Sequence, residues 1–186
     1  MSSELELLKQ LRDITGAGIL DCKKYLTKSN NNLDDAVKLM RSEAGVKAEK
    51  KSNRIAAEGV VHYFSNDKKA LLIEINSETD FVAKGDDFLG FVNKACQIII
   101  NQPYHTLSEL TESAETEIKI ELDELRKNFI TKLGENIQIR RFEIINKDKS
   151  SVTGYTHNNK IGAMVILKSS DEQLSKDICM QIVASS

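Results

Sequence analysis

The sequence is poor in cysteine and proline, and it has no long apolar run and no strong excess of either charge. Its three cysteines lie far apart and form no CxxC pair, which is typical of reduced thiols in a cytosolic protein. No apolar run approaches the length that spans a bilayer. The first fourteen residues mix acidic residues into a helical pattern, which is not the pattern of a signal peptide. We therefore expect a soluble, cytoplasmic protein.

The near balance of charge also limits the classes of partner. The net charge is −2, whereas a general nucleic-acid binder carries a strong basic excess, so we expect no direct contact with nucleic acid. Hydrophobic residues make up 40% of the chain and charged residues 29%, which is ordinary for one or two small globular domains. Neither the composition nor the charge predicts an oligomeric state.

The motifs of common catalytic and cofactor sites are missing as well. The three histidines show no metal-ligand spacing, and the chain contains neither GxxxxGK[ST] nor GxGxxG. Carboxylates crowd between Glu74 and Asp87, where a paired acid and base is conceivable. However, Asp86 and Asp87 are well explained as charges at the N-terminus of the following helix. We therefore expect a binding protein rather than an enzyme, without metal or cofactor.

Apolar residues recur at helical spacing in three short stretches of the first 45 residues. The first, residues 5–14, ends where Gly16 and Gly18 permit a sharp break. The second covers residues 19–26, and an asparagine cluster then supplies an N-cap for the third, residues 33–44. The pattern predicts a three-helix module over residues 1–45 that resembles a ubiquitin-associated fold. Ile19 and Leu20 follow the glycine turn, where they either close the small core or are exposed.

Residues 46–55 are highly charged and lack a clean apolar face. They predict a charged and partly helical linker between the module and the rest of the chain. A contact of this basic run with nucleic acid is the less favoured interpretation, because such runs are usually solvated.

The remainder of the chain contains a repeat. Two strand patterns separated by a polar turn occupy residues 59–75, and the same arrangement recurs 92 residues later. Four positions match across this offset: Val60 with Val152, Tyr63 with Tyr155, Leu72 with Met164, and Ile73 with Val165. A helical pattern follows each hairpin. The sequence therefore predicts an α+β fold with a duplicated ββα core and small antiparallel sheets, divided into subdomain 1 (residues 56–146) and subdomain 2 (residues 147–186).

An inserted helical excursion separates the two copies. Pro103 precedes it, residues 106–109 have capping-box spacing, and an apolar helical stripe then runs to Gly134. Residues 136–145 are rich in isoleucine and predict a strand that pairs with the first hairpin and completes its sheet.

A short loop between the first hairpin and its helix contains an unexpected aromatic residue. Phe81 lies among polar residues and outside both neighbouring periodic patterns. Such a residue either plugs the local core or anchors a partner, and burial is the commoner case. The second copy has no counterpart of Phe81, which favours a function specific to the first copy.

Several motifs together resemble the elongation factor Ts family, in family order and over nearly the whole chain. They are Leu11-Arg12-Asp13-Ile14-Thr15-Gly16-Ala17-Gly18 with Asp21-Cys22-Lys23-Lys24, Thr79-Asp80-Phe81-Val82-Ala83-Lys84, Gly134-Glu135-Asn136-Ile137 with Arg140-Arg141, and Tyr155-Thr156-His157 before Ile161-Gly162. The resemblance implies a guanine-nucleotide exchange factor for elongation factor Tu, the GTPase that carries aminoacyl-tRNA to the ribosome.

The resemblance also implies roles for individual residues. The N-terminal module would grip the GTPase domain through Arg12, Ile19 and Leu20. The loop residues Thr79, Asp80, Phe81 and Val82 would intrude near the magnesium site and help to dislodge the ion. Leu133 and Gly134 would lie near the same interface, and His157 would carry the contact of subdomain 2.

The chain departs from the family at its end. The second copy stops after its helix, without the closing strand of longer members, and Lys160 stands where many members have arginine. We therefore expect the second sheet to be one strand short, through truncation or because another chain supplies the strand. Two other functions stay open: a ubiquitin-associated-like adaptor without exchange activity, and an acid–base enzyme acting through Asp80.

Overall fold

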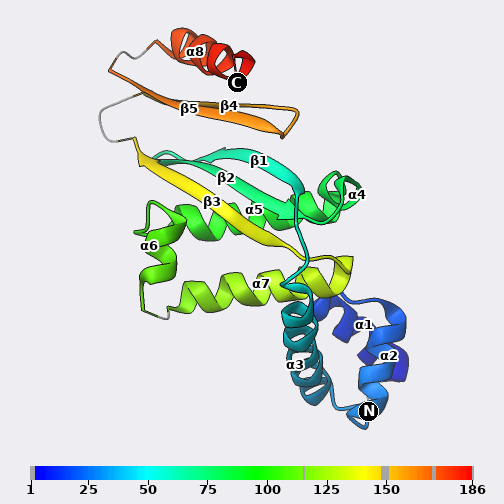
Figure 1. Ribbon diagram of the computed structural model, residues 1–186. Coiled ribbons are helices and arrows are strands. Elements are labelled where there is room, and N and C mark those ends of the chain that lie inside the picture. Colours follow the sequence, from blue (N-terminus) through cyan, green and yellow to red (C-terminus); the bar gives the residue numbers. More distant parts are fainter. Residues whose placement is uncertain (1–2, 115, 148–150, 169–170, 186) are drawn as a thin grey trace.

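Figure 1 shows the computed structural model, which describes residues 3–114, 116–147, 151–168 and 171–185. The predicted α+β fold is confirmed. Helix α8, a two-stranded sheet, a three-stranded sheet and a layer of helices follow one another from the top of the view, and the N-terminal module lies beneath them. Among the described residues, no helix is both long and apolar enough to cross a membrane.

The N-terminal module is the predicted bundle of three helices, α1 (Glu4–Thr15), α2 (Ile19–Lys28) and α3 (Leu33–Lys51). Gly16 ends α1 in the left-handed conformation, with φ of 65°, and the Asn32 side chain caps the start of α3. The core of the module consists of Leu11, Ala17, Cys22, Tyr25, Leu26, Ala36 and Met40. Leu5 and Ile14, which helical spacing assigned to the same apolar stripe, are instead exposed, because the small bundle covers only the middle of α1.

Helix α3 extends well beyond the predicted module. Its last turns occupy residues 46–51, the first part of the expected linker, and pack against α7 (Glu117–Leu133). Ala48 is 1% exposed and belongs to the main core, so this charged segment packs on the core through a single small apolar residue. Since α3 packs in both cores, it joins the module to the rest of the chain as one helix. The domain limits at residues 45 and 55 stay a prediction about independent folding.

The three-stranded sheet has the order β1-β2-β3, with β1 (Glu58–Ser65), β2 (Lys69–Ser77) and β3 (Gln138–Asn146) all antiparallel. The expectation that the strand after the helical excursion completes this sheet is therefore confirmed. Helix α5 (Asp86–Ile100) covers one face, where Phe88, Phe91 and Ile99 are buried against the strands. The excursion forms α6 (Leu107–Glu112) and α7, which complete the helical layer.

The second copy of the ββα unit consists of β4 (Ser151–His157), β5 (Ile161–Leu167) and α8 (Glu172–Ala184). Its described sheet has two strands, one fewer than the first, as expected from the sequence. The two sheets stack: the Val61 amide donates to the Asn159 carbonyl over 2.8 Å, and the Tyr63 ring lies against Gly154. Parts of the predicted subdomain 2, residues 148–150, 169–170 and 186, lie outside the described residues.

Candidate functional site

The loop after β2 contains a single turn of helix, α4 (Asp80–Ala83), which presents Phe81 to solvent. The Thr79 hydroxyl caps this turn by accepting a hydrogen bond from the Val82 amide over 3.3 Å. Ala83 is buried against the core, whereas Phe81 is 87% exposed. The interpretation of Phe81 as a plug for its own core is therefore wrong, and the alternative of an outward-facing anchor agrees with its position.

Charged residues surround this turn. The Lys84 ammonium bonds the Asp80 carboxylate over 2.8 Å, and this hydrogen bond, with the nearby positive charges of Lys84 and Lys160, lowers the pKa of Asp80. Lys160 in turn pairs with Glu58 over 2.6 Å. Asp80 therefore stays ionised at neutral pH. Both partners of the Asp80–Lys84 pair are largely exposed, so this pair contributes little to stability.

The turn is held from behind by a residue that the sequence analysis did not single out. The carboxylate of Glu135, between α7 and β3, accepts hydrogen bonds from the amides of Glu78 and Thr79 and from the Thr79 hydroxyl. These residues are 56 or 57 positions apart, so no local pattern links them. The only signal available was the occurrence of Glu135 within a motif shared with the family.

The expected contact residues of the N-terminal module lie around one corner of the bundle. Arg12 belongs to the last turn of α1, while Ile19 and Leu20 begin α2 directly after Gly18. All three are exposed, Leu20 at 85%, so the two apolar side chains do not close the core. Ile14, near the end of α1, is 56% exposed and adds a further exposed apolar side chain.

Leu133 and Gly134 are engaged within the chain. Leu133 is partly buried against the main core, and Gly134 ends α7 with φ of 79°. The carbonyl of Gly134 accepts a hydrogen bond from the Lys51 ammonium over 2.6 Å. Both residues therefore lie at the junction between α3, α7 and the Glu135 contacts.

His157 is exposed at the end of β4, where its ring contacts the hydroxyl of Tyr155 at 3.2 Å. The turn that follows contains Asn158 and Asn159, both with positive φ, and leads to Lys160. Since Lys160 pairs with Glu58 at the start of β1 and acts on Asp80, this turn lies near α4. In Figure 1 the tip of the β4–β5 hairpin, α4 and α2 all lie on the right-hand side of the view.

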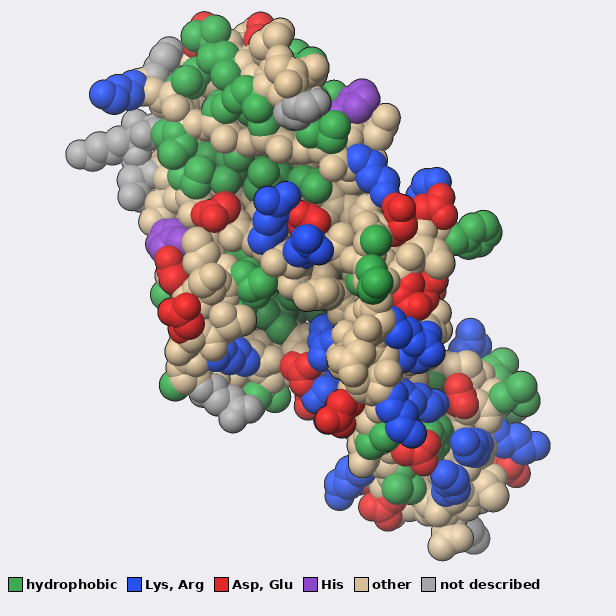
Figure 2. Space-filling model, in the orientation of Figure 1, with side chains coloured by type: hydrophobic (Ala, Val, Ile, Leu, Met, Phe, Trp, Pro, Cys, Tyr) green, Lys and Arg blue, Asp and Glu red, His purple; other side chains and the backbone are tan. Residues whose placement is uncertain are grey.

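Charged and apolar side chains gather on different parts of the surface (Figure 2). Figure 2 shows Lys and Arg side chains, interspersed with acidic ones, over the N-terminal module and its junction with the core. Hydrophobic side chains gather instead over the second subdomain at the top of the view. Ile19 and Leu20 are exposed apolar side chains of this module.

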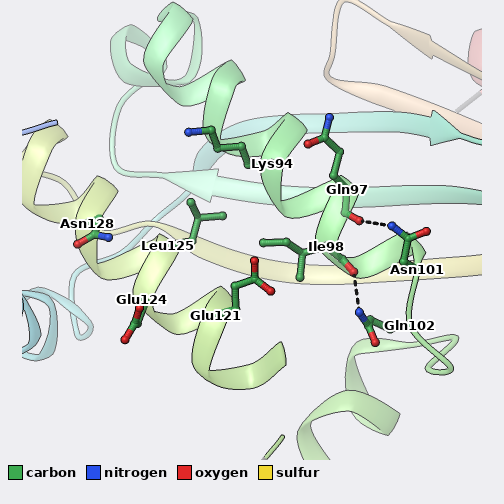
Figure 3. Close-up of a pocket in the computed structure, with 9 residues that line it drawn as sticks. All are labelled: Lys94, Gln97, Ile98, Asn101, Gln102, Glu121, Glu124, Leu125 and Asn128. Atoms are coloured by element: carbon green, nitrogen blue, oxygen red, sulfur yellow. Dashed lines mark hydrogen bonds between the residues drawn. The ribbon is translucent and has the colours of Figure 1, made fainter. Parts of the chain in front are cut away.

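A groove of about 540 Å³ lies between α5 and α7, away from the predicted site residues. Figure 3 shows its lining, in which the Asn101 and Gln102 amides donate to the carbonyls of Gln97 and Ile98. None of the residues predicted for function lines it. In the described parts of the chain, no cluster of three His, Cys, Asp or Glu side chains is arranged to hold a metal ion.

Comparisons with known proteins relate both parts of the chain to described families. A family model described as elongation factor TS matches residues 78–186, and a UBA-like domain model matches residues 2–46. The chain is 41% identical to elongation factor Ts of Methylococcus capsulatus and 42% identical to that of Alkalilimnicola ehrlichii, in each case over 100% of this chain. It is 39% identical to elongation factor Ts of Francisella tularensis subsp. novicida over 97% of this chain. The matches cover 64%, 63% and 61% of these relatives, so the chain spans somewhat less than two thirds of their length.

Proposed function

The chain belongs to the elongation factor Ts family, and we propose that it acts in the cytoplasm as a guanine-nucleotide exchange factor for elongation factor Tu. It binds the GDP-bound GTPase, promotes release of GDP and so allows the GTP-bound form to be regenerated. The observation that carries the proposal is Phe81, a large apolar side chain 87% exposed on a capped turn of helix. Holding such a residue in water is unfavourable for the free chain and favourable for a chain that inserts it into a partner.

The mechanism follows from how GDP is bound. Magnesium bridges phosphate oxygens of the nucleotide and demands near-octahedral oxygen ligands at short distance. A rigid ring that wedges apart the side chains around the ion therefore removes much of its affinity. The ionised Asp80 carboxylate competes for the groups that organise the ion's shell. No covalent bond is made or broken, so the chain is not an enzyme in the chemical sense.

Binding and wedging are assigned to different surfaces. We assign the grip on the GTPase to Arg12, Ile19 and Leu20 at the corner of the module. We assign a second contact to His157 in the β4–β5 hairpin. Thr79 and Val82 present the wedge. We assign a further contact with the GTPase, near the same interface, to Leu133 and Gly134.

The alternative is an adaptor that uses the UBA-like module for recognition and the core as a passive scaffold. Thermodynamic linkage separates the two functions, because a factor that lowers GDP affinity must lose affinity itself when GDP is bound. The test is calorimetric titration of the chain into elongation factor Tu with and without GDP, together with release of fluorescent GDP. Exchange predicts weaker binding with GDP and accelerated release. Equal affinities and unaltered release would establish the adaptor.

A further inference from the structure

The conformation of α4 cannot come from the helix itself. A helix of four residues is far shorter than one that is stable in isolation, so its shape depends on contacts from outside. Three of these contacts converge on the Glu135 side chain. Oε2 accepts from the amides of Glu78 and Thr79 at 3.1 and 3.0 Å, and Oε1 accepts from the Thr79 hydroxyl at 2.6 Å.

The hydroxyl of Thr79 transmits this contact to the turn. A hydroxyl has one proton to donate and lone pairs with which to accept. Because the proton is directed to Glu135, the lone pairs are left for the Val82 amide, which Thr79 caps at 3.3 Å. The carboxylate thus fixes the rotamer in which Thr79 caps α4. Phe81 lies inside this turn, so the cap positions its backbone although the Phe81 ring itself is exposed.

A reciprocal contact joins the same two segments. The Glu78 carboxylate accepts from the Asn136 amide over 2.6 Å and lies 3.5 Å from the Arg54 guanidinium. The two segments are therefore bonded in both directions. Glu135 accepts from the backbone at the end of β2, and Glu78 accepts from the backbone of the α7–β3 connection. Asn136 is buried, at 3% exposure, which favours a fixed geometry for these bonds.

The other side of the connection is bonded to the end of α3. The Lys51 ammonium donates to the Gly134 carbonyl, and the Asn136 side-chain amide donates to the carbonyls of Ser52 and Arg54 at 3.3 and 2.8 Å. Since α3 also forms part of the N-terminal module, residues 134–136 lie between the two surfaces assigned to the partner.

We propose that Glu135 is a positioning residue for exchange: it holds the Thr79–Val82 turn in the conformation that presents Phe81, and residues 134–136 tie that turn to α3. The inference rests on the proposed function, because Glu135 acts through Phe81 and not on the partner. The module and the wedge are thereby presented to the GTPase as one rigid unit. If the turn is loosened, a smaller fraction of the molecules presents Phe81 in the active conformation, while the surfaces that contact the GTPase are all retained.

The first experiment uses the free chain and does not depend on exchange activity. Amide hydrogen exchange is measured for Glu78, Thr79 and Val82 in the unmutated chain and in Glu135→Ala and Glu135→Gln. Glu135→Ala should accelerate exchange at these amides by about tenfold or more, while amides of α5 and β2 stay protected. Glu135→Gln should fall between the two, because its oxygen still accepts from the backbone. Unchanged exchange in Glu135→Ala, or faster exchange in Glu135→Gln than in Glu135→Ala, would overturn the positioning role.

The second experiment measures release of fluorescent GDP from elongation factor Tu. Glu135→Ala should lower the saturating rate about tenfold, equivalent to ~1.4 kcal/mol, with affinity for the nucleotide-free GTPase nearly unchanged. Glu121→Ala is the control, since Glu121 is exposed on α7 and its side chain makes no hydrogen bond or ion pair with the described residues. A Glu135→Ala chain with loosened amides but a normal saturating rate would overturn the link to exchange. If the unmutated chain is inactive, the proposed function fails, and the hydrogen-exchange result still decides whether Glu135 positions the turn.

Discussion

The ring of Tyr63 lies so close to Gly154 that any side chain at position 154 would force the ring to shift. A Cβ atom added there would lie 2.1 Å from Tyr63 Cδ2 and 2.3 Å from Cε2. Tyr63 belongs to β1 and Gly154 to β4, so this contact is where the two sheets stack. Both β4 and β5 contact β1 and β2, so the Tyr63–Gly154 pair lies within a broader interface between the two copies of the repeat.

Gly154→Ala should therefore destabilise the protein by about 1–3 kcal/mol, the usual cost of overpacking a well-packed interface. Chemical denaturation followed by circular dichroism measures it. Gly90→Ala is the matched control: Gly90 is in α5, and an added Cβ meets no atom of the described chain within 4 Å. That change should stabilise the protein by up to about 1 kcal/mol. Equal effects of the two substitutions would contradict the close contact with Tyr63.

The N-terminal module should lose stability in acid because of Glu43. The Tyr25 hydroxyl donates to the Glu43 carboxylate over 2.5 Å, and Lys28 pairs with it over 2.9 Å. These bonds, that of Tyr25 first, lower the pKa of Glu43 from 4.5 to about 2. A lowered pKa stabilises the folded state above the unfolded value of 4.5, and this contribution is lost as the pH falls toward about 2.

Glu43→Gln should consequently flatten the dependence of module stability on pH between those two values, since glutamine keeps a bond to Tyr25 but does not titrate. Amide exchange at Tyr25 and Met40 reports on the module within the full chain. The unmutated and mutant chains should converge in stability near the acid end of the range. Parallel curves throughout would show that Glu43 is not the titrating group.

Deletion of residues 1–45 should leave the core folded and weaken binding to elongation factor Tu strongly. The deletion retains Ala48 and Lys51, which make the buried contact with α7 and the bond to Gly134. Thermal unfolding and calorimetric binding measure the two effects. A full-length chain with Ile19→Ser and Leu20→Ser serves as the control, because it should lose affinity without any change in the core. If the deletion unfolds the core, the domain boundary is wrong.

The repeat and most helices were predictable because their signals are local. Strand alternation, a helical stripe and a capping residue each extend over a few positions, and the buried set of α5 agrees with the spacing of its apolar residues. The Asn32 and Thr106 caps and the left-handed Gly134 likewise occur where the sequence placed helix ends. The offset of 92 residues required only a comparison of the chain with itself.

Features that depend on distant packing were not predictable. The buried face of α3 near its end consists of Ala48 among charged residues, too small a signal to distinguish a packed helix from a linker. The contact of Glu135 with Thr79 joins residues 56 positions apart. The approach of Lys160 to Asp80 requires the two sheets to stack first. In each case the pairing is set by tertiary structure rather than by a pattern in the sequence.

His157→Ala should reduce affinity for elongation factor Tu modestly and leave the saturating rate of GDP release nearly intact. The side chain is exposed, and its described polar contacts are with Tyr155 and Asn158 rather than with α4. Titration of the release rate against chain concentration separates the two quantities. Lys160→Ala is a useful comparison, because Lys160 acts on Asp80 and should also affect the saturating rate. Equal loss of affinity and rate in His157→Ala would contradict this division.

Phe81→Ala tests the wedge without disturbing the fold. Since the ring is 87% exposed, its removal creates no cavity and should change the free energy of unfolding very little. Any loss of exchange therefore arises at the contact with the partner. Val82→Ala is the structural control, because Val82 is partly buried against the core and its truncation should lower stability instead.

The effect of Phe81→Ala on exchange distinguishes an anchor from a wedge. Loss of a simple anchor weakens binding to nucleotide-free and GDP-bound elongation factor Tu alike, so the ratio of the two affinities survives. A wedge acts on that ratio, because exchange is negative coupling between the factor and GDP. Couplings of this kind are roughly 1–3 kcal/mol, and each 1.4 kcal/mol of lost stabilisation slows release by about tenfold. We expect Phe81→Ala to bind the nucleotide-free GTPase yet to accelerate release far less at saturation.

Magnesium supplies the decisive comparison for Phe81. If the Phe81 ring displaces the ion, a chain that lacks the ring displaces magnesium poorly. Excess Mg²⁺ should therefore suppress the residual activity of Phe81→Ala more than the activity of the unmutated chain. Stopped-flow release of fluorescent GDP over a range of magnesium concentrations measures this, with EDTA as the limit in which the ion is already absent. In EDTA the two chains should differ least, because there is no ion left to dislodge. A constant ratio between them at every magnesium concentration would mean that Phe81 contributes to exchange without acting on the ion.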